Sequence, residues 1–276
     1  MPGNVIRIAA AGLVAAMICG GAGVAVGADS AVLIDAAING SHRTEVNVQR
    51  DQYRHPKETL LFFGLEPDMT VVEITPGGGW YTEVLAPVLR GEGTYHAATY
   101  RITGTSPQYF RRMDANYRAK LEASPDVYDG VEIVYFDPQA PQFGPPGSAD
   151  MVLTFRNVHN WANSGTAELM FRGFADVLKS GGILGVVEHR AKPGTSLEKQ
   201  IISGYMTEDY VIQMARHAGF RLVARSEVNA NDKDTTLHPG GVWNLLPNLR
   251  DVPQADITKM RAIGESDRMT LKFVKD

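Results

Sequence analysis

The sequence predicts an α/β fold in which helices cover both faces of a parallel sheet. From residue 69 onward, short apolar segments alternate with longer segments of helical periodicity, a pattern typical of parallel sheets. The composition is that of a globular protein, because 44% of the 276 residues are hydrophobic and 21% are charged. A glycine-rich turn follows the first apolar segment, as occurs where a strand leads into a helix beside a ligand. The predicted strands are residues 71–74, 93–98, 131–136, 151–155, 183–187, 220–226 and 269–274.

The predicted helices carry start and stop signals. Pro56 stands at the first turn of a helix that ends at Gly64, and Gly219 closes a helix that begins near Thr207. The turn at residues 179–182 separates another helix from the fifth strand. The predicted helices are residues 56–63, 81–90, 107–123, 167–178 and 207–218.

The N-terminal residues resemble an export signal. Arg7 precedes an apolar stretch rich in alanine and glycine, and Val26-Gly27-Ala28 fits a small-residue cleavage site. A membrane anchor is the alternative, but the many small residues make a weak transmembrane segment. We therefore expect residues 1–28 to be a signal peptide, residues 29–59 a helical lead and residues 60–276 the main domain. The expected location is the periplasm, with no stable membrane association after signal removal.

Charge and cysteine content exclude several classes of function. The net charge is −4 and the basic residues are scattered, so neither nucleic acid nor an anionic membrane surface is an expected partner. The one cysteine, Cys19, lies in the signal segment, so a mature chain has no disulfide, cysteine nucleophile or cysteine metal ligand. No pattern in the sequence specifies an oligomeric state.

The segment from Glu73 through Gly79 is the most informative motif. Glu73 lies near the end of the first predicted strand, and Thr75-Pro76 leads into Gly77-Gly78-Gly79 and then a helix. Glycines allow positive φ angles and close approach of a ligand to backbone amides. The free N–H groups at the following helix N-terminus favour negative charge. A nucleotide-like ligand fits such a turn, although a glycine turn without a ligand explains the motif equally well.

Polar residues gather where the predicted strands end. Ligands of parallel sheets bind at the carboxyl ends of the strands, so these residues are candidates for one site. The general polarity of loops explains part of the gathering. The candidates that follow the second to fifth strands are Thr99, Asp137, Arg156, Asn157, His159, Asn160, Glu188 and His189.

Two histidines are candidates for acid–base chemistry. His159 lies one turn past a strand end beside Asn160, and His189 follows Glu188 at the next strand end. Each has a structural alternative, namely a hydrogen bond to a loop carbonyl or an ion pair. Arg156 is a candidate for binding a carboxylate of cofactor or substrate, or for pairing with Glu73 or Glu188.

Other chemistries lack their motifs. His159, Glu188, His189, Glu265 and Asp267 could converge on a metal ion, but no H-x-H or H-x-x-x-H pair is present, so we expect no metal. No G-x-S-x-G elbow occurs, which disfavours a serine hydrolase. The glycine turn does not fit G-x-G-x-x-G, which disfavours a dinucleotide oxidoreductase.

The sequence resembles the class I S-adenosylmethionine-dependent methyltransferases from about residue 60 to the C-terminus. The resemblance rests on four segments in the family's order, and more narrowly on Gly-Gly-Gly-Trp-Tyr and Phe-Arg-Asn-Val-His-Asn-Trp, which occur in exported predicted methyltransferases. It implies a Rossmann-like three-layer sandwich with a seven-stranded, mostly parallel sheet whose last strand is antiparallel. The four segments are residues 71–79, 131–137, 150–161 and 178–184.

The resemblance also implies roles for single residues. S-Adenosylmethionine would be the cofactor and a small or medium-sized molecule the acceptor. Asp137 corresponds to the acid that binds the adenine amino group. Thr99 stands where the family usually has an acid for the ribose, and Thr75-Pro76 stands where it usually has glycine. The expected cofactor residues are Glu73, Thr75, Gly77, Gly78, Gly79, Thr99, Asp137, Arg156 and Asn157.

The expected catalytic residues are His159, Asn160 and His189, with His159 as the base. The antiparallel last strand would also bring residues 264–268 to the ligand edge. A non-catalytic periplasmic ligand-binding protein that uses the same edge remains the alternative function.

Overall fold

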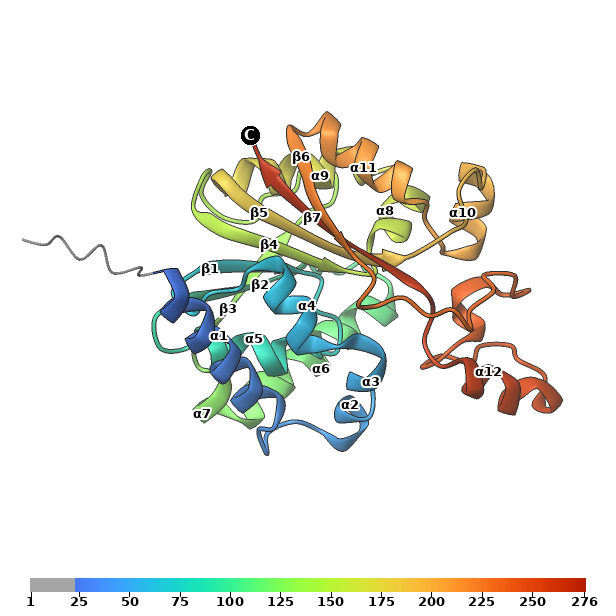
Figure 1. Cartoon of the computed structure of the whole chain (residues 1–276), viewed down its shortest axis with the longest axis horizontal. Helices are drawn as coiled ribbons and strands as arrows, with labels where there is room; N and C mark the ends of the chain where they lie inside the picture. Colours follow the sequence, from blue (N-terminus) through green and yellow to red (C-terminus); the bar gives the residue numbers. More distant parts are fainter. Residues whose placement is uncertain (1–22) are drawn as a thin grey trace, which may run out of the picture.

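The computed structural model describes residues 23–276, with side chains from residue 29 onward, so most of the expected signal peptide lies outside the described residues. Seven strands form one sheet in the order β3-β2-β1-β4-β5-β7-β6, and only β7 is antiparallel to its neighbours (Figure 1). The expected seven-stranded, mostly parallel sheet is confirmed. The strands are β1 (Thr70–Ile74), β2 (Thr94–Tyr100), β3 (Val131–Phe136), β4 (Ala149–Phe155), β5 (Leu178–His189), β6 (Phe220–Ser226) and β7 (Arg268–Lys275).

Helices lie on both faces of the sheet (Figure 1). Within the described residues, none of them has the length and apolar character needed to span a bilayer. Two short 3₁₀ helices, η1 (Gly241–Asn244) and η2 (Gln254–Asp256), lie in the long connection before β7. The α-helices are α1 (Gly23–Ile38), α2 (Glu45–Val48), α3 (Asp51–Arg54), α4 (Pro56–Phe63), α5 (Thr82–Leu89), α6 (Gln108–Ala123), α7 (Pro125–Tyr128), α8 (Val158–Ser164), α9 (Ala167–Val177), α10 (Leu197–Ser203), α11 (Glu208–His217) and α12 (Ile257–Ile263).

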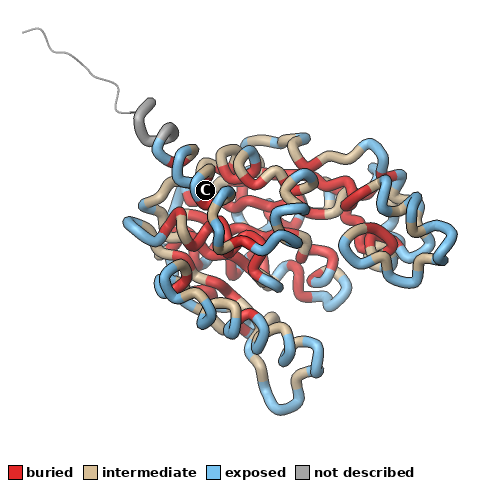
Figure 2. The backbone as a smooth tube through the Cα atoms, turned by 90° about the horizontal axis from the view of Figure 1, so that it is seen from below, coloured by how far each residue is buried: buried red, intermediate tan, exposed pale blue. Residues whose placement is uncertain are grey.

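Alternation along the strands builds one core on each face. Val71 of β1 packs in the core that contains α1, α4 and α5, whereas Val72 and Ile74 pack in the core beneath α8, α9 and α11. Figure 2 shows the buried segments gathered in the interior of the molecule, with exposed residues on the outer turns. Strands buried on both faces read as apolar runs, which is why the sequence located them well.

The sheet reverses its winding direction between β1 and β4. The chain passes from β1 to β2 and β3 on one side, whereas β4, β5 and β7 continue on the other side. Ile74 lies opposite Thr154 at the carboxyl ends of these two strands. In open α/β sheets a crevice forms at this reversal, so the fold places a ligand site there.

The N-terminal lead packs against the main sheet. Ile34 and Ala37 of α1 are buried in the core shared with α4 and α5. The buried carboxylate of Glu83 on α5 accepts hydrogen bonds from Arg43 at 3.4 Å and Asn47 at 2.8 Å. These bonds hold α2 against α5, and Arg43 also donates to Asp51 of α3 at 2.6 Å.

Helices α7, α10 and α12 and the two 3₁₀ helices were not predicted from the sequence, and two further segments differ from the prediction. The segment after β4, expected as a loop, forms helix α8, which Gly165 ends with φ 69°. The expected turn at residues 179–182 lies inside β5 as a bulge. There Leu178 pairs with Ala149 and Ile183 pairs with Met151, so extra residues of β5 loop out around Gly181, whose φ is 76°.

Candidate functional site

A cavity of about 660 Å³ opens at the carboxyl ends of β1, β2 and β4. Its size falls within the range of about 300–1,000 Å³ that small-molecule sites occupy. Its walls come from the glycine turn, the loop after β2, the start of α6, α8 and the lead. The lining residues are Asn47, Arg50, Arg54, Glu73, Thr75, Pro76, Gly77, Gly78, Trp80, Tyr81, Tyr100, Arg101, Ile102, Ser106, Tyr109, Phe110, Met113, Pro138, Phe155, Arg156, Asn157, Asn160, Asn163 and Ser164.

The glycine turn presents bare backbone to the cavity. Gly77 and Gly79 have φ angles of 62° and 75°, which favour glycine. Gly78 does not have a positive φ, and a Cβ added there would have no neighbouring atom within 4 Å among the described residues. The same open space surrounds a Cβ at Gly77. The turn therefore leaves room for a ligand against its peptide groups.

Two residues other than glycine also adopt positive φ at this edge. Thr75 follows β1 with φ 55°, and Arg156 follows β4 with φ 61°. Each continues the sheet ladder by one hydrogen bond, from Thr75 N to the Ala98 carbonyl and from Arg156 N to the Val187 carbonyl, both at 2.7 Å. Such conformations cost about 1–3 kcal/mol each and cluster at ligand sites. Thr75 and Arg156 both line the cavity.

Glu73 is a buried carboxylate in the cavity wall. Its side chain accepts a hydrogen bond from the hydroxyl of Tyr95. Burial raises the pKa of Glu73 to about 7, because the hydrogen bond from Tyr95 offsets only part of the desolvation. The group thus titrates near neutral pH.

Aromatic side chains form an apolar wall. Tyr81 stacks on Phe155 with ring centroids 3.5 Å apart, and Tyr100 meets Phe110 edge to face at 5.4 Å. The indole of Trp80 donates to the Asn47 carbonyl at 2.8 Å and lies against Arg54. Flat ring systems of a ligand would find stacking partners along this wall.

Four arginines surround a single carboxylate beside the cavity, and we call them the arginine cluster: Arg50, Arg54, Arg156 and Arg268. Glu265 accepts from Arg50 at 2.7 Å, from Arg54 at 3.1 Å and from Arg268 at 3.2 Å. The side chain of Arg156 makes no hydrogen bond or ion pair to any described residue. The alternative in which Arg156 pairs with Glu73 or Glu188 is therefore not observed among the described residues, whereas Glu265 lies near the ligand edge as expected.

The cluster shifts the pKa of its own members. Burial alone would raise the pKa of Glu265, but attraction to Arg54, Arg268, Arg50 and Arg156 lowers it from its usual 4.5 to about 2. Burial and neighbouring arginines hold the pKa of Arg54 well below its usual value. Burial lowers that of Arg156 to about 10. The cluster thus holds an excess of positive charge in a poorly solvated place.

We expect Glu265→Gln to lower the free energy of unfolding by roughly 3 kcal/mol near neutral pH. A carboxylate whose pKa is lower in the folded chain than in the unfolded chain stabilises the fold at pH values above its unfolded pKa. That contribution is lost as the pH falls from about 4.5 toward 2. Urea unfolding of both chains across this range measures it, with the exposed Glu92→Gln as control. A difference between parent and variant that is as large at pH 2.5 as at pH 7 would contradict an ionic role for Glu265.

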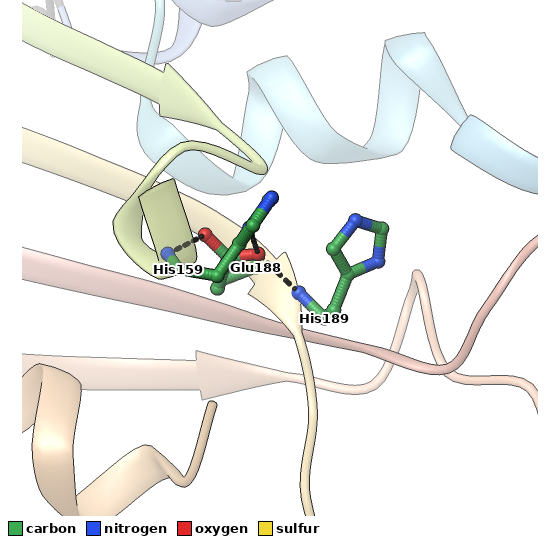
Figure 3. Close-up of side chains that lie close together, drawn as sticks. All are labelled: His159, Glu188 and His189. Atoms are coloured by element: carbon green, nitrogen blue, oxygen red, sulfur yellow. Dashed lines mark hydrogen bonds and ion pairs between the residues drawn. The ribbon is translucent and has the colours of Figure 1, made fainter. Parts of the chain in front are cut away.

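The two candidate histidines meet at Glu188, at the ends of β5 and α8 (Figure 3). His159 Nδ1 lies 3.0 Å from Glu188 Oε1. Glu188 is fully buried and also accepts from the backbone N–H groups of Val158, His159 and His189. With Glu188 ionised, Nδ1 of His159 carries the proton and Nε2 is left as the acceptor.

The imidazole of His189 points away from Glu188 (Figure 3) and lies 2.5 Å from Ser266 Oγ through Nδ1. Burial holds the pKa of His189 well below its usual range, and the nearby guanidinium groups of Arg156, Arg268 and Arg54 lower it further. The ring centroids of the two histidines are 5.3 Å apart. The histidine pair therefore adjoins the arginine cluster.

His159, Glu188 and His189 bring three possible metal-ligand atoms within 4.8 Å of one another. However, the Glu188 carboxylate already accepts three backbone N–H groups and the imidazole of His159. Its lone pairs are occupied by donors, so this geometry suits a positioned imidazole better than a cation.

The structure brings seven of the expected site residues into the cavity wall and leaves five outside it. Gly79 belongs to the glycine turn but does not line the cavity. Thr99 pairs with Tyr135 of β3, whereas its neighbour Tyr100 lines the cavity. Asp137 is exposed, and its Oδ1 accepts from Gln139 N at 2.9 Å, as in a turn. His159 and His189 form the pair described above. The lining residues are Glu73, Thr75, Gly77, Gly78, Arg156, Asn157 and Asn160.

Sequence reasoning missed the contribution of the lead. Asn47, Arg50 and Arg54 line the cavity, and two of them belong to the arginine cluster. The spacing of Arg50 and Arg54 by four residues in a helix-leaning segment indicates one shared helix face. The spacing of the two arginines predicts a basic helix face, but the neighbouring sequence does not show which part of the sheet this face contacts.

No protein-family model matches the sequence, and no curated protein matches it either. Solved structures do match. An S-adenosylmethionine-dependent methyltransferase from Aquifex aeolicus is 18% identical, with a TM-score of 0.51 over 72% of this chain and 93% of that one. Human N-acetylserotonin methyltransferase in complex with S-adenosylmethionine is 12% identical, with a TM-score of 0.50 over 90% of this chain and 56% of that one. The chain has the fold of these methyltransferases.

The same fold also occurs with another chemistry. The [4+2]-cyclase SpnF is 15% identical, with a TM-score of 0.55 over 90% of this chain and 93% of that one. Fold alone therefore does not decide the reaction, and the residues of the site must carry that argument.

Proposed function

We propose that this chain is an S-adenosylmethionine-dependent methyltransferase that acts on a small or medium-sized acceptor. The observation that carries the proposal is the cavity at the reversal of the sheet, where the glycine turn offers open space beside Gly77 and Gly78. Thr75, Gly77, Gly78 and Asn157 line one part of the cavity and would hold the methionyl part of the cofactor. Tyr100 and Phe110 also line the cavity and would hold the adenosyl part.

The chain's own residues would perform the transfer mainly by alignment. Methyl transfer from a sulfonium needs the acceptor atom held in line with the methyl group, and a base where the acceptor carries a proton. Asn157 and Asn160 line the cavity and can orient the acceptor. His159 is not itself a lining residue, but it precedes the lining residue Asn160 on α8. We assign the base to His159, because Glu188 fixes its ring and leaves Nε2 as a proton acceptor.

The alternative function is a non-catalytic periplasmic ligand-binding protein. The [4+2]-cyclase has the same fold and a different reaction, so this fold does not by itself establish methyl transfer. A screen distinguishes the two. The purified chain is incubated with S-adenosylmethionine and a panel of oxygen, nitrogen and sulfur nucleophiles, and S-adenosylhomocysteine is measured. An enzyme produces S-adenosylhomocysteine with at least one acceptor, whereas a binding protein shows ligand-dependent thermal stabilisation and no product.

We also propose export to the periplasm, with cleavage after Ala28. Helix α1 runs through this point, so a mature chain would begin with Asp29 and Ser30 at a helix N-terminus, where such residues stabilise helices. Edman sequencing of the protein from the periplasmic fraction of a bacterial host is expected to begin at Asp29. A chain that begins at Met1 in the cytoplasm would contradict the export proposal.

A further inference from the structure

The cavity is strongly positive although the chain is acidic overall. Four arginines line it, Arg50, Arg54, Arg101 and Arg156, and Glu73 is the one acidic residue among the described lining residues. The net charge of the whole chain is −4. Four of the chain's 27 basic residues thus line one cavity that holds a single acidic lining residue, and this local excess of positive charge raises the local concentration of anions.

Internal pairing leaves much of this charge uncompensated. Glu265 contacts Arg50, Arg54 and Arg268, so one carboxylate serves three guanidinium groups. Arg156 makes no hydrogen bond or ion pair to any described residue, yet it lines the cavity. The partly buried guanidinium of Arg156 thus has no partner within the described part of the chain, and its planar set of donors matches an oxyanion.

The cofactor cannot supply the missing negative charge. S-Adenosylmethionine carries one carboxylate but also an ammonium and a sulfonium, so it adds one net positive charge to the site. Even if its carboxylate contacts one arginine, the total charge in the cavity rises. The balancing group must therefore arrive with the other reactant.

We propose that the methyl acceptor is an anionic small molecule whose carboxylate or phosphate binds Arg156, with Arg50 and Arg54 providing the surrounding positive charge. This assignment rests on the proposed methyltransferase function. It names a charge class for the acceptor and makes Arg156 its specificity-determining residue.

The test uses inorganic phosphate and benzoate as probes of the two oxyanion classes. Each is titrated calorimetrically, at constant ionic strength, into the chain saturated with S-adenosylhomocysteine. We expect at least one probe to bind without displacing S-adenosylhomocysteine. Arg156→Gln should weaken the binding of that probe about 10- to 100-fold, as expected for a lost charge-assisted bond. Arg156→Lys should weaken it less, since the charge remains.

The side chain of Arg156 makes no hydrogen bond to any described residue, so these substitutions remove no hydrogen bond that stabilises the fold. Glutamine and lysine also meet the same positive φ of 61° as arginine does. Arg172→Gln, on the exposed face of α9, is the matched control and should bind the probe like the parent. Thermal melts establish that all variants are folded.

Three results would overturn the proposal: no binding of either probe to the saturated chain, displacement of S-adenosylhomocysteine by the probe, or parental probe affinity in Arg156→Gln. Displacement would assign the arginines to the cofactor carboxylate. Probe binding by a chain that never binds S-adenosylhomocysteine would instead overturn the methyltransferase function, and the acceptor assignment with it, while the oxyanion site would stand.

Discussion

Gly78→Val is expected to weaken binding of S-adenosylmethionine by about 1–3 kcal/mol or more while the chain remains folded. Gly78 lines the cavity, does not have a positive φ, and has open space where a Cβ would stand. The valine side chain therefore occupies ligand space without straining the turn. Calorimetric titration beside a thermal melt measures both effects.

Gly91→Val is the matched control for this substitution. Gly91 also lacks a positive φ and has open space around an added Cβ, but it follows α5 at the opposite end from the glycine turn. Its variant should bind like the parent. Parental affinity in a folded Gly78→Val chain would place the cofactor away from the glycine turn.

His159→Gln is expected to lower turnover by about 10²–10⁴ and to leave the affinity for S-adenosylhomocysteine nearly unchanged. Glutamine cannot accept and release the acceptor's proton, whereas the cavity lining that binds the cofactor excludes His159. The measurement is the rate of S-adenosylhomocysteine formation with the acceptor found by the screen.

Two further variants separate catalysis from structure. Glu188→Gln should also lower turnover, because the amide no longer fixes the proton on Nδ1 of His159. His189→Gln should retain most activity, since its ring points away from Glu188. Loss of activity in His189→Gln alone would move the base to His189. Full activity in His159→Gln would leave alignment by Asn157 and Asn160 as the source of catalysis.

The sheet was predictable from the sequence because its strands are buried on both faces and read as apolar runs. The glycine turn was predictable because residues 77–79 combine a strand end with a helix start. Thr75 and Arg156 were identified as candidates by their position, but their positive φ angles were not predictable, since neither residue type favours that conformation.

The arginine cluster and the histidine pair were harder to predict, because both depend on contacts between distant segments. Arg50 and Arg54 meet Glu265 across more than two hundred residues of chain, and Glu188 reaches His159 from the neighbouring strand. For Asp137 the difficulty lies in the local sequence itself. A strand-end acid before proline fits both a turn and an adenine contact, and local sequence does not separate the two.

Calorimetric titration of S-adenosylhomocysteine into the purified chain decides whether the cavity at the glycine turn binds the cofactor. We expect one binding site per chain, with a higher melting temperature in the presence of ligand. Both effects should be weaker in Gly78→Val and unchanged in Gly91→Val. No heat of binding and no thermal stabilisation by S-adenosylhomocysteine or S-adenosylmethionine, in a chain shown to be folded, would contradict this expectation.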